Sequence, residues 1–411
     1  MHAVGIIAEY NPFHSGHLYH IAESRKRLSG ACAVVCVMGG NFVQRGEPAV
    51  FSKHARAEAA MCCGADLVFE LPTPWALRGA QGFAGGGVAL LAALGVADYL
   101  SFGSEQGDLD ALRTLADATL EPDFDNKMAA ELRRNVPYAV ARQELLRRKA
   151  GECANLLSRP NNILAVEYLR AIKLQKVDIT PITVKRLERI DADESCMEST
   201  SGLCRSASEL RTMLGLGEEV TGFIPEAAEA VYRREMSAHR GPVSTDNLEQ
   251  GMLARLRLLS REDFAGLADV TEELADRLYR AVQRAGSIET VLREAQTKRY
   301  TLSRLRRLLL CACLGISADT AAGTPPYARL LAANAVGCEL LREIRAKSNT
   351  PIITKPAAVR ALPEAVRELF ALEGGATDFY VLGYGAEEER RGGSEYRTSP
   401  VIASEIMSYE F

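Results

Sequence analysis

The sequence contains no CxxC pair and no histidines at zinc-finger spacing, although it has ten cysteines in 411 residues. Zinc fingers depend on such spacings, so this class of metal site is excluded. Free, buried thiols in a reducing cytoplasm are the expected state of these cysteines. A metal site assembled from the distant pairs Cys62–Cys63 and Cys311–Cys313 remains the alternative.

Long apolar runs are also missing. The apolar run after Met1 covers about six residues, has no basic leader and meets Glu9 and Pro12, so no secretory signal is expected. A second uncharged run, GFAGGGVALLAALGVA at 82–97, is shorter than the roughly 20 residues of a membrane span. It predicts a buried helix, and the protein is expected to be cytoplasmic, without a membrane partner.

A large excess of charge of either sign is absent as well. The chain has a net charge of −4, with 25% charged and 47% hydrophobic residues, which is the balance of a globular protein rather than a disordered one. Its length favours two or three domains, each with its own core. Any nucleic-acid site must therefore be a local basic patch.

The first hundred residues alternate between short β-like apolar runs and helical stretches. Such alternation is typical of βαβ units and a parallel sheet. The expected strands are AVGIIAE, CAVVCVM, ADLVFEL, DYLSF and, later, DITPITVK; helices are expected near 17–28, 53–63 and 81–94. The sequence thus predicts a Rossmann-like, doubly wound α/β domain that binds ligands at the carboxyl ends of its strands.

Residues from about 108 to 174 show helical spacing of leucines among arginines and glutamates, which predicts a helical insertion. The segment SASELRTMLGLG has the serine start and glycine stop of another helix, so the first domain is expected to span 1–220. Residues 221–411 are expected to form a mainly α-helical C-terminal region with short strands at PIIT and DFYVLGY. The segment EEERRGGSE is expected to be a solvated loop.

Histidine is scarce, yet three of the six histidines lie in the stretch GIIAEYNPFHSGHLYH at 5–20. His14 and His17 stand where the first expected strand gives way to the first expected helix. A helix amino terminus offers free backbone N–H groups, and Gly16 allows close approach of a phosphate. The imidazoles would add donors to an α-phosphate and to departing pyrophosphate. The alternative is that they only cap or pack against the helix, and for His20 both interpretations stay open.

The HxGH pattern at the first strand-to-helix junction resembles the HIGH-type nucleotidyltransferase superfamily. That resemblance implies attack on the α-phosphate of a nucleoside triphosphate with release of pyrophosphate. A serine and a basic residue are then expected late in the same domain. Ser206, Ser208 and Arg211 fit that place, with Arg211 on the β- and γ-phosphates; helix capping is the alternative for the serines.

Further segments resemble one family within this superfamily. They are EYNPFHSGH, GNFVQRGEPAVFSKHARAEAA, GADLVFELP, FGSE, PNNILAVEYL, VKR, KSNTPIITKP and ATDFYVLGY, spread over nearly the whole chain. Together they are similar to the tRNA(Met) cytidine acetate ligase family. The resemblance implies a nucleotidyltransferase-type sheet, an acetyl-adenylate made from ATP and acetate, and transfer of the acetyl group to the wobble cytidine of elongator tRNA(Met), giving N4-acetylcytidine.

Carried over by position, the resemblance gives catalytic roles to His14 and His17. The ATP contacts that it implies, together with the later serines and arginine, are Ile7, Ala8, Glu9, Tyr10, Asn11, Pro12, Phe13, His14, Ser15, Gly16, His17, Leu18, Tyr19, His20, Gly103, Asn162, Arg186, Ser206, Ser208 and Arg211. The loop 44–48 with Lys53 is a candidate rim of the site, with a solvated position as the alternative for Lys53. Two residues depart from the family pattern and put the fine positioning of the ligand in question. Gly39 stands where serine is expected. Glu209, which could pair with Arg211 or repel phosphate, replaces a shorter side chain.

An acidic protein that binds tRNA needs a concentrated basic surface. Residues 298–307 contain five basic residues and no acid, and a helix there would gather Arg299, Ser303, Arg306 and Arg307 opposite its leucines. A solvated helix face is the alternative for 298–307. A sparser basic region around KSNTPIITKP is expected to line the same channel. The expected tRNA contacts are Lys298, Arg299, Arg304, Arg306, Arg307 and Lys355.

The wobble base must leave the anticodon stack to be acylated, which calls for an aromatic or guanidinium platform. Tyr10 and Phe13 are the nearest candidates, with core packing as the alternative for Phe13. No carboxylate cluster predicts a dedicated metal site, so magnesium is expected only on the triphosphate of ATP. No protein partner is indicated.

Two other functions stay open. One is a small-molecule adenylyltransferase that leaves AMP on its product. The basic helical half argues against it, because that chemistry needs little beyond the α/β domain. The other is a tRNA-binding protein whose nucleotide site senses ATP without catalysis.

Overall fold

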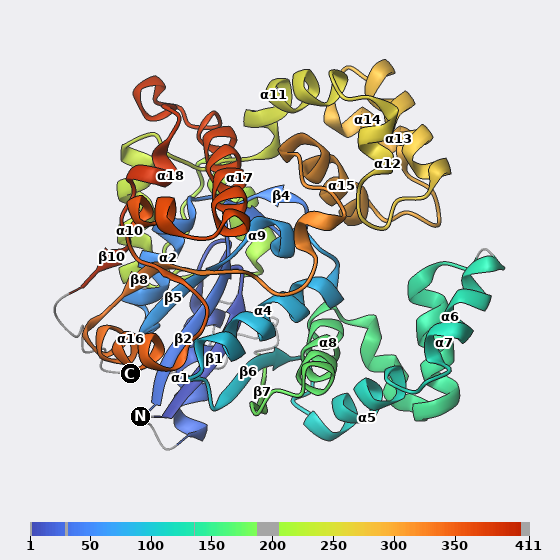
Figure 1. The fold of residues 1–411 in the computed structure, drawn as a ribbon, viewed down its shortest axis with the longest axis horizontal. Coiled ribbons are helices and arrows are strands. Elements are labelled where there is room, and N and C mark those ends of the chain that lie inside the picture. Colours follow the sequence, from blue (N-terminus) through green and yellow to red (C-terminus); the bar gives the residue numbers. More distant parts are fainter. Residues whose placement is uncertain (1, 29–31, 135, 187–204, 404–411) are drawn as a thin grey trace, which may run out of the picture.

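The computed structural model describes residues 2–28, 32–134, 136–186 and 205–403. A twisted central sheet carries helices on both faces, and two helical lobes extend from one side of it (Figure 1). The eight cysteines within the described ranges are free thiols, as expected. Within the same ranges, no helix is long and apolar enough to cross a membrane.

The strands follow the predicted pattern closely in the first half of the chain. Their bounds are β1 His2–Ala8, β2 Cys32–Gly39, β3 Phe42–Val43, β4 Glu47–Pro48, β5 Leu67–Leu71, β6 Tyr99–Ser104, β7 Thr180–Lys185, β8 Ala328–Ala333, β9 Ile352–Ile353 and β10 Val401–Ile402. The main sheet has the order β10-β8-β5-β2-β1-β6-β7, with β9 beside β8, while β3 and β4 form a separate hairpin. The predicted doubly wound α/β fold is confirmed.

The helices lie on both faces of the sheet and in the two lobes. Their bounds are α1 Ser15–Arg27, α2 Lys53–Cys62, α3 Thr73–Ala76, α4 Ala80–Leu94, α5 Leu109–Thr119, α6 Phe124–Arg133, α7 Tyr138–Ala150, α8 Pro160–Gln175, α9 Ala207–Leu216, α10 Glu226–Ser237, α11 Thr245–Arg257, α12 Arg261–Ala265, α13 Glu272–Arg284, α14 Ile288–Ala295, α15 Leu302–Leu314, α16 Ala335–Lys347, α17 Glu364–Val381 and α18 Ser394–Arg397. Short 3-10 turns are η1 Gly151–Ser158, η2 Asp319–Ala321, η3 Pro356–Ala361 and η4 Glu387–Glu389.

The strand order creates a switch point between β1 and β6. From β1 the chain builds the sheet outward through β2 and β5, then returns to place β6 and β7 on the other side of β1. All of these neighbouring pairs are parallel. In such sheets the helices before and after the switch point diverge, which leaves a crevice at the carboxyl ends of the two strands. In folds of this kind ligands bind above the two strands at the switch point, which are β1 and β6 here.

Both faces of β1 are buried, because successive side chains point to opposite faces. Val4 and Ile6 belong to the core that α2 and α10 cover, while Ile7 belongs to the core under α4. At Gly5 a Cβ atom would lie 2.7 Å from a methyl carbon of Leu91, so glycine lets α4 approach the strand. The predicted buried helix at 82–97 is thus α4, packed directly on the sheet.

The C-terminal region returns to this sheet, which the sequence did not predict. Strand β8 pairs antiparallel with β5, and β10 pairs parallel with β8, so the sheet crosses the expected boundary near residue 220. The prediction of a strand at DFYVLGY was wrong, because most of that segment continues helix α17. Its aromatic residues pack against the helical lobe, where Tyr380 is fully buried. A strand at PIIT is confirmed as β9.

The two lobes differ in origin. The predicted insertion at 108–174 forms the helices α5 to α8 and the turn η1. Among these helices, α8 packs on α4 and β6 and shares the core of the sheet domain. Helices α11 to α15 form the second lobe around a core of their own, joined by α17. In Figure 1 these lobes lie one above the other on the right.

Candidate functional site

The loop between β1 and α1 carries the histidine motif, and the first three backbone donors of α1 are already paired. The N–H of Ser15 donates to the carbonyl oxygen of Phe223 at 3.0 Å, and the N–H of Gly16 donates to Nδ1 of His14 at 3.1 Å. The N–H of His17 donates to the carbonyl oxygen of His14. The expectation that free N–H groups await a phosphate here is therefore wrong for this structure.

Gly16 is required by its neighbour. A Cβ atom at this position would lie 2.9 Å from Cε1 of His14, so any larger residue would displace that imidazole. The sequence-based hypothesis assigned Gly16 to the close approach of a phosphate. The structure shows that Gly16 already has a role without a ligand, which is to make room for the histidine that caps α1.

His14 and His17 combine the two interpretations that the sequence left open. Their rings stack with centroids 3.8 Å apart, and each Nδ1 accepts a backbone hydrogen bond, from Gly16 and from His14 respectively. An Nδ1 atom that accepts carries no proton, so the neutral ring must carry its proton on Nε2. Capping thus uses one nitrogen of each ring and leaves an Nε2–H donor for a ligand.

The histidines stay neutral because His14 is buried and the half-buried His17 is enclosed by neighbouring rings. Burial, followed by the charges of Arg186 and Arg211, lowers the pKa of His14 to about 4. Burial and the neighbouring His14 lower the pKa of His17 well below its usual value. Two uncharged imidazoles can therefore stack, and both act as hydrogen-bond donors rather than as cations at neutral pH.

These shifts predict a loss of stability in mild acid. His14 and His20 have pKa values of about 4, below the usual 6.5, so the unfolded chain binds more protons and stability falls as pH drops through this window. By pH 5.5, protonation of each histidine is expected to have lowered the free energy of unfolding by about 1 kcal/mol. Melting temperatures measured at pH 7.5, 6.5 and 5.5 test this, with His20→Gln giving a shallower fall. An equal fall in wild type and variant would contradict it.

His20 contacts strand β6. Its Nε2 lies 2.9 Å from Oγ of Ser101, and Ser24 bonds to the same hydroxyl at 2.7 Å. The ring therefore joins α1 to β6 across the switch point. Of the two interpretations that the sequence left open, packing is the one that this structure displays.

The neighbouring strands β6 and β7 bring Gly103 and Arg186 together at their carboxyl ends. The backbone N–H of Arg186 donates to the carbonyl oxygen of Ser104, and a Cβ on Gly103 would meet the Arg186 side chain at 3.3 Å. Asn162, at the start of α8, accepts from the N–H of Glu105 at 3.1 Å. The charge of Arg186 contributes to lowering the pKa of all three histidines, so Arg186 lies near the histidine loop, with Gly103 beside it.

Helix α9 supplies the arginine that the sequence paired with the histidines. Arg211 donates to the carbonyl oxygen of Asn11 at 2.8 Å and to Oγ of Ser208 at 3.1 Å. It also lies 3.9 Å from Glu47. The structure therefore joins Arg211 and Ser208 to the β1–α1 loop from 200 residues away along the chain.

Ser206 and Glu209 have a local role. The Ser206 hydroxyl accepts from the N–H of Glu209, and the Glu209 carboxylate accepts from the N–H of Ser206 at 2.8 Å, which is a capping box. Glu209 also lies 3.6 Å from Arg205. Capping is the role that the structure displays for Ser206, with Glu209 as its partner.

The loop 44–48 is a junction between the site and the helical lobe. The N–H of Gln44 donates to Oε1 of Glu9 at 2.6 Å, and Arg307 donates to the carbonyl oxygen of Gln44 at 3.1 Å. Arg306 pairs with Glu47 at 2.5 Å. Burial raises the pKa of Glu9. This loop therefore fits its expected place beside the site.

Lys53 is neither solvated nor on a rim, and both interpretations drawn from the sequence were wrong. Its ammonium lies 2.7 Å from Glu70 and 2.7 Å from Glu395, and all three side chains are buried. Arg329 lies 2.9 Å from the other oxygen of Glu395. Glu395 belongs to the expected solvated loop EEERRGGSE, so that prediction fails at its last residue. The group joins α2 and β5 to the C-terminal strands.

Arg56 is the residue that sequence reasoning missed. It is fully buried, and its guanidinium donates to the carbonyl oxygens of Glu9, Gly39 and Gly40, with Nε donating to Phe51. It thereby fixes the ends of β1 and β2 beside the histidine loop. An arginine within the alanine-rich stretch HARAEAA is the signal that could have revealed it, since such a helix face is expected to be buried.

Gly39 is compatible with the serine that was expected there. A Cβ at this position would have its nearest neighbours at 3.8 and 3.9 Å, which is ordinary van der Waals contact. Gly39→Ser is therefore expected to change the free energy of unfolding by less than about 1 kcal/mol. Chemical denaturation measures this, and a larger loss would show that the loop needs glycine.

Tyr10 and Phe13 are both buried, so the hypothesis that Tyr10 stacks on a base is wrong for this structure, while core packing of Phe13 is confirmed. Tyr10 bonds to Sγ of Cys36, and its ring contacts those of Phe13 and His17 at 4.9 Å. Ile7 and Leu18 also pack against the core. Tyr10 and Phe13, which are fully buried, can offer a ligand only their backbone atoms.

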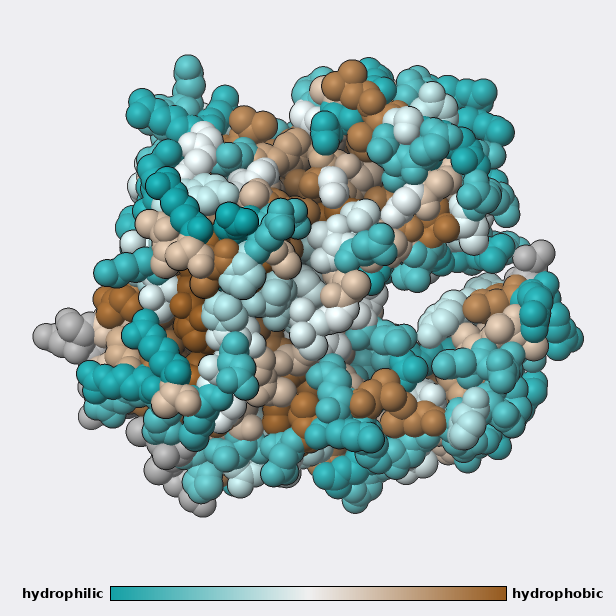
Figure 2. Space-filling view, viewed as in Figure 1, coloured by the Kyte–Doolittle hydropathy of each residue, from teal (hydrophilic) through white to brown (hydrophobic). Residues whose placement is uncertain are grey.

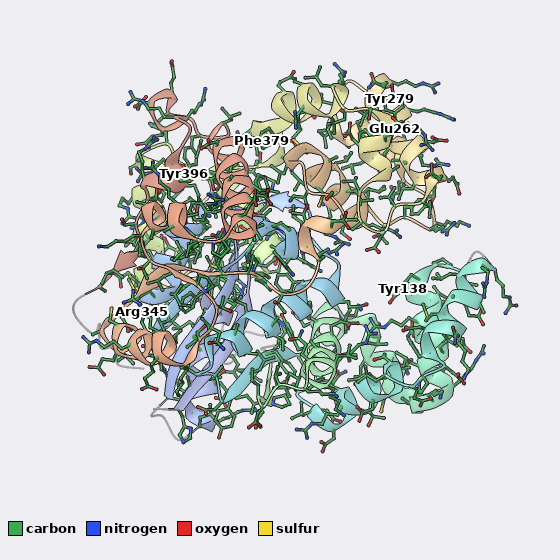
Figure 3. The ribbon with its side chains drawn as sticks, viewed as in Figure 1. Tyr138, Glu262, Tyr279, Arg345, Phe379 and Tyr396 are labelled. Atoms are coloured by element: carbon green, nitrogen blue, oxygen red, sulfur yellow. The ribbon has the colours of Figure 1, made fainter. Side chains whose placement is uncertain are left out.

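The expected tRNA residues divide between turn and helix. Lys298 and Arg299 are exposed before α15, so the single helical face predicted for Arg299 through Arg307 was wrong. Arg299 and Arg304 lie over the ring of Tyr300, at 5.7 and 5.3 Å. Lys355 is exposed before η3, and the preceding Thr354 accepts from Arg345 of α16 at 3.2 Å; Figure 3 labels Arg345.

Comparison with known proteins agrees with this geometry. Residues 1–395 match the family model described as HIGH Nucleotidyl Transferase. The tRNA(Met) cytidine acetate ligase of Acetivibrio thermocellus is 35% identical over 98% of this chain and 100% of its own length. The chain belongs to the tRNA(Met) cytidine acetate ligase family. It is therefore an enzyme of the HIGH nucleotidyltransferase type.

Two further relatives support the assignment. The ligase of Caldanaerobacter subterraneus subsp. tengcongensis is 38% identical over 93% of this chain and 96% of its own length. A crystal structure of Thermotoga maritima TmcAL bound with alpha-thio ATP has a TM-score of 0.91 at 32% identity, covering 98% of this chain and 100% of that one.

Within the described residues of this chain, no group of three or more His, Cys, Asp or Glu could hold a metal.

Proposed function

We propose that this enzyme acetylates the wobble cytidine of elongator tRNA(Met), using ATP and acetate, in the cytoplasm. The observation that carries the proposal is the meeting of His14, His17, Arg186 and Arg211 above β1 and β6. Two neutral donors and two cations at a switch point suit a triphosphate. The family relatives support the choice of tRNA as acceptor.

In the proposed first step, a carboxylate oxygen of acetate attacks the α-phosphorus of ATP. The bond from that phosphorus to the bridging oxygen of the β-phosphate breaks, and pyrophosphate leaves with magnesium as part of the substrate complex. Nε2–H groups of His14 and His17 donate to oxygens whose negative charge grows in the transition state. Arg211 and Arg186 neutralise the triphosphate.

In the proposed second step, the exocyclic amine of the cytidine attacks the carbonyl carbon of acetyl-adenylate. The bond between that carbon and the phosphate oxygen breaks, AMP leaves, and the amine loses one proton. The product is N4-acetylcytidine.

Exchange of labelled pyrophosphate into ATP tests the first step. We expect exchange that depends on acetate and does not require tRNA. With tRNA(Met) added, its mass should rise by one acetyl group. Exchange without acetate, or a stable adenylylated product other than acetyl-adenylate formed without tRNA, would instead favour a small-molecule adenylyltransferase. Binding of tRNA without exchange under any substrate mixture would favour an ATP sensor.

A further inference from the structure

A groove of about 880 Å³ lies between the two helical lobes. Its walls are the start of α4, the insertion helices α6 to α8, and helix α15 with residues 268–271. Figure 2 shows the molecule hollowed on the right, between the upper and lower lobes. This volume is at the upper end for small-ligand sites and far exceeds what acetate needs.

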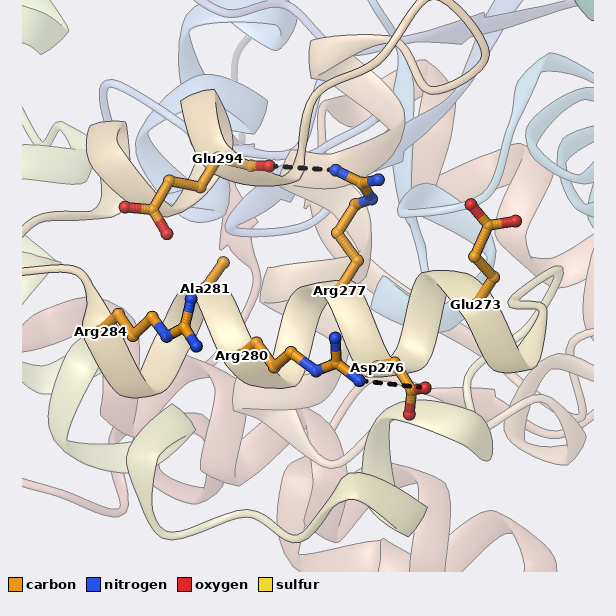
Figure 4. A pocket seen from close by; sticks show the side chains of 7 residues that line it. All are labelled: Glu273, Asp276, Arg277, Arg280, Ala281, Arg284 and Glu294. Carbon is orange, nitrogen blue, oxygen red and sulfur yellow. Dashed lines mark hydrogen bonds and ion pairs between the residues drawn. The ribbon is translucent and has the colours of Figure 1, made fainter.

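The groove has an excess of positive charge. Arg78, Arg142, Arg304 and Arg307 line it, against the carboxylates of Glu167 and Asp269. A smaller hollow of about 300 Å³ on α13 differs, because its arginines face an equal number of carboxylates, as Figure 4 shows for Arg280 and Asp276. An arginine-rich groove attracts a polyanion, whereas a charge-balanced hollow does not.

One wall presents an aromatic ring. Tyr138, at the start of α7, is 51% exposed and lines the groove, and Figure 3 labels it on the insertion. A large exposed aromatic beside arginines suits stacking on an unpaired base. The buried Tyr10 and Phe13 do not offer such a face.

The groove adjoins the candidate site. Arg307 lines the groove and also bonds to Gln44, whose N–H donates to Glu9 of the histidine loop. On the opposite wall, Ile163 follows Asn162 in α8. Among the described residues that line the groove, none is a predicted ATP contact. A polyanion held there would lie beside the reaction site without occupying it.

We propose that the anticodon arm of the tRNA binds in this groove, with the insertion as one wall and Tyr138 stacking on an unpaired base of the loop. Arg78 contacts phosphate together with the arginines of α15. This inference rests on the proposed function and extends it, because it gives the insertion a role in binding RNA.

The test uses the full chain with two variants, Tyr138→Ala and Arg78→Ala. The Kd for tRNA(Met) is expected to rise about 5- to 100-fold for Tyr138→Ala, the range for losing one stacked base. For Arg78→Ala the slope of log K against log salt is expected to become shallower by about 1. Tyr138→Phe keeps the ring and should bind within about twofold of wild type.

Two arginines outside the groove serve as controls: Arg148→Ala on α7 and Arg280→Ala on α13 should leave the Kd unchanged. Acetate-dependent pyrophosphate exchange without tRNA should be unchanged in all variants. Unchanged tRNA affinity in both groove variants would overturn the groove proposal. Wild-type enzyme that binds tRNA in this groove but shows no exchange would overturn the proposed function and leave the groove standing.

Discussion

Replacing His14 with asparagine is expected to leave α1 intact and to slow acetate-dependent pyrophosphate exchange by about 100- to 1,000-fold. Asparagine is a favoured N-cap residue, so its side-chain oxygen can accept from the N–H of Gly16 as Nδ1 does now. It has no donor at the place of Nε2. The variant therefore separates the capping role from the proposed catalytic role.

Two further variants sharpen the result. His14→Ala removes both the cap and the donor, so it should lose similar activity and, in addition, about 1 kcal/mol of stability. His17→Asn should behave like His14→Asn, because Nδ1 of His17 also accepts from the backbone. If His14→Asn keeps exchange within about threefold of wild type, the histidine only caps the helix.

Replacing Lys53 with methionine is expected to lower the free energy of unfolding by about 3–5 kcal/mol. The substitution keeps the length of the side chain but removes the ammonium between Glu70 and Glu395, which are both buried. Arg329 then faces both carboxylates, at 2.9 Å from Glu395 and 3.9 Å from Glu70. Urea denaturation at pH 7 measures the loss. Because Lys53 joins α2 to residues near the C-terminus, we expect β8 and β10 to pack more loosely when the free energy of unfolding falls.

Matched variants separate the buried charge from the loss of a lysine. Lys26→Met removes an exposed lysine 3.9 Å from Glu23 and should change stability by less than about 0.5 kcal/mol. Adding Glu70→Gln to Lys53→Met should recover part of the lost free energy of unfolding, since it removes the buried carboxylate charge of Glu70. A loss below about 1 kcal/mol for Lys53→Met would show that water or rearrangement compensates the carboxylates.

Local patterns predicted the first half of the fold well. Alternating apolar runs identified β1, β2, β5, β6 and β7 within a few residues, because parallel strands buried on both faces are nearly continuous in apolar residues. The same rule misled at DFYVLGY, whose apolar and aromatic residues suit a strand as well as a buried helix. Strand β8, six residues long, was missed for a related reason: ARLLAA carries no β-branched residue.

Short-range spacing was enough to define the histidine loop and its position between a strand and a helix, and the chain's motifs were enough to reveal the family resemblance. Which distant groups meet could be learned only from the folded molecule. Arg211 reaches Asn11 across 200 residues, Lys53 pairs with Glu395, and Arg56 fixes the ends of β1 and β2. Spacing along a chain carries no information about such partners, since they are chosen by how the sheet and helices pack.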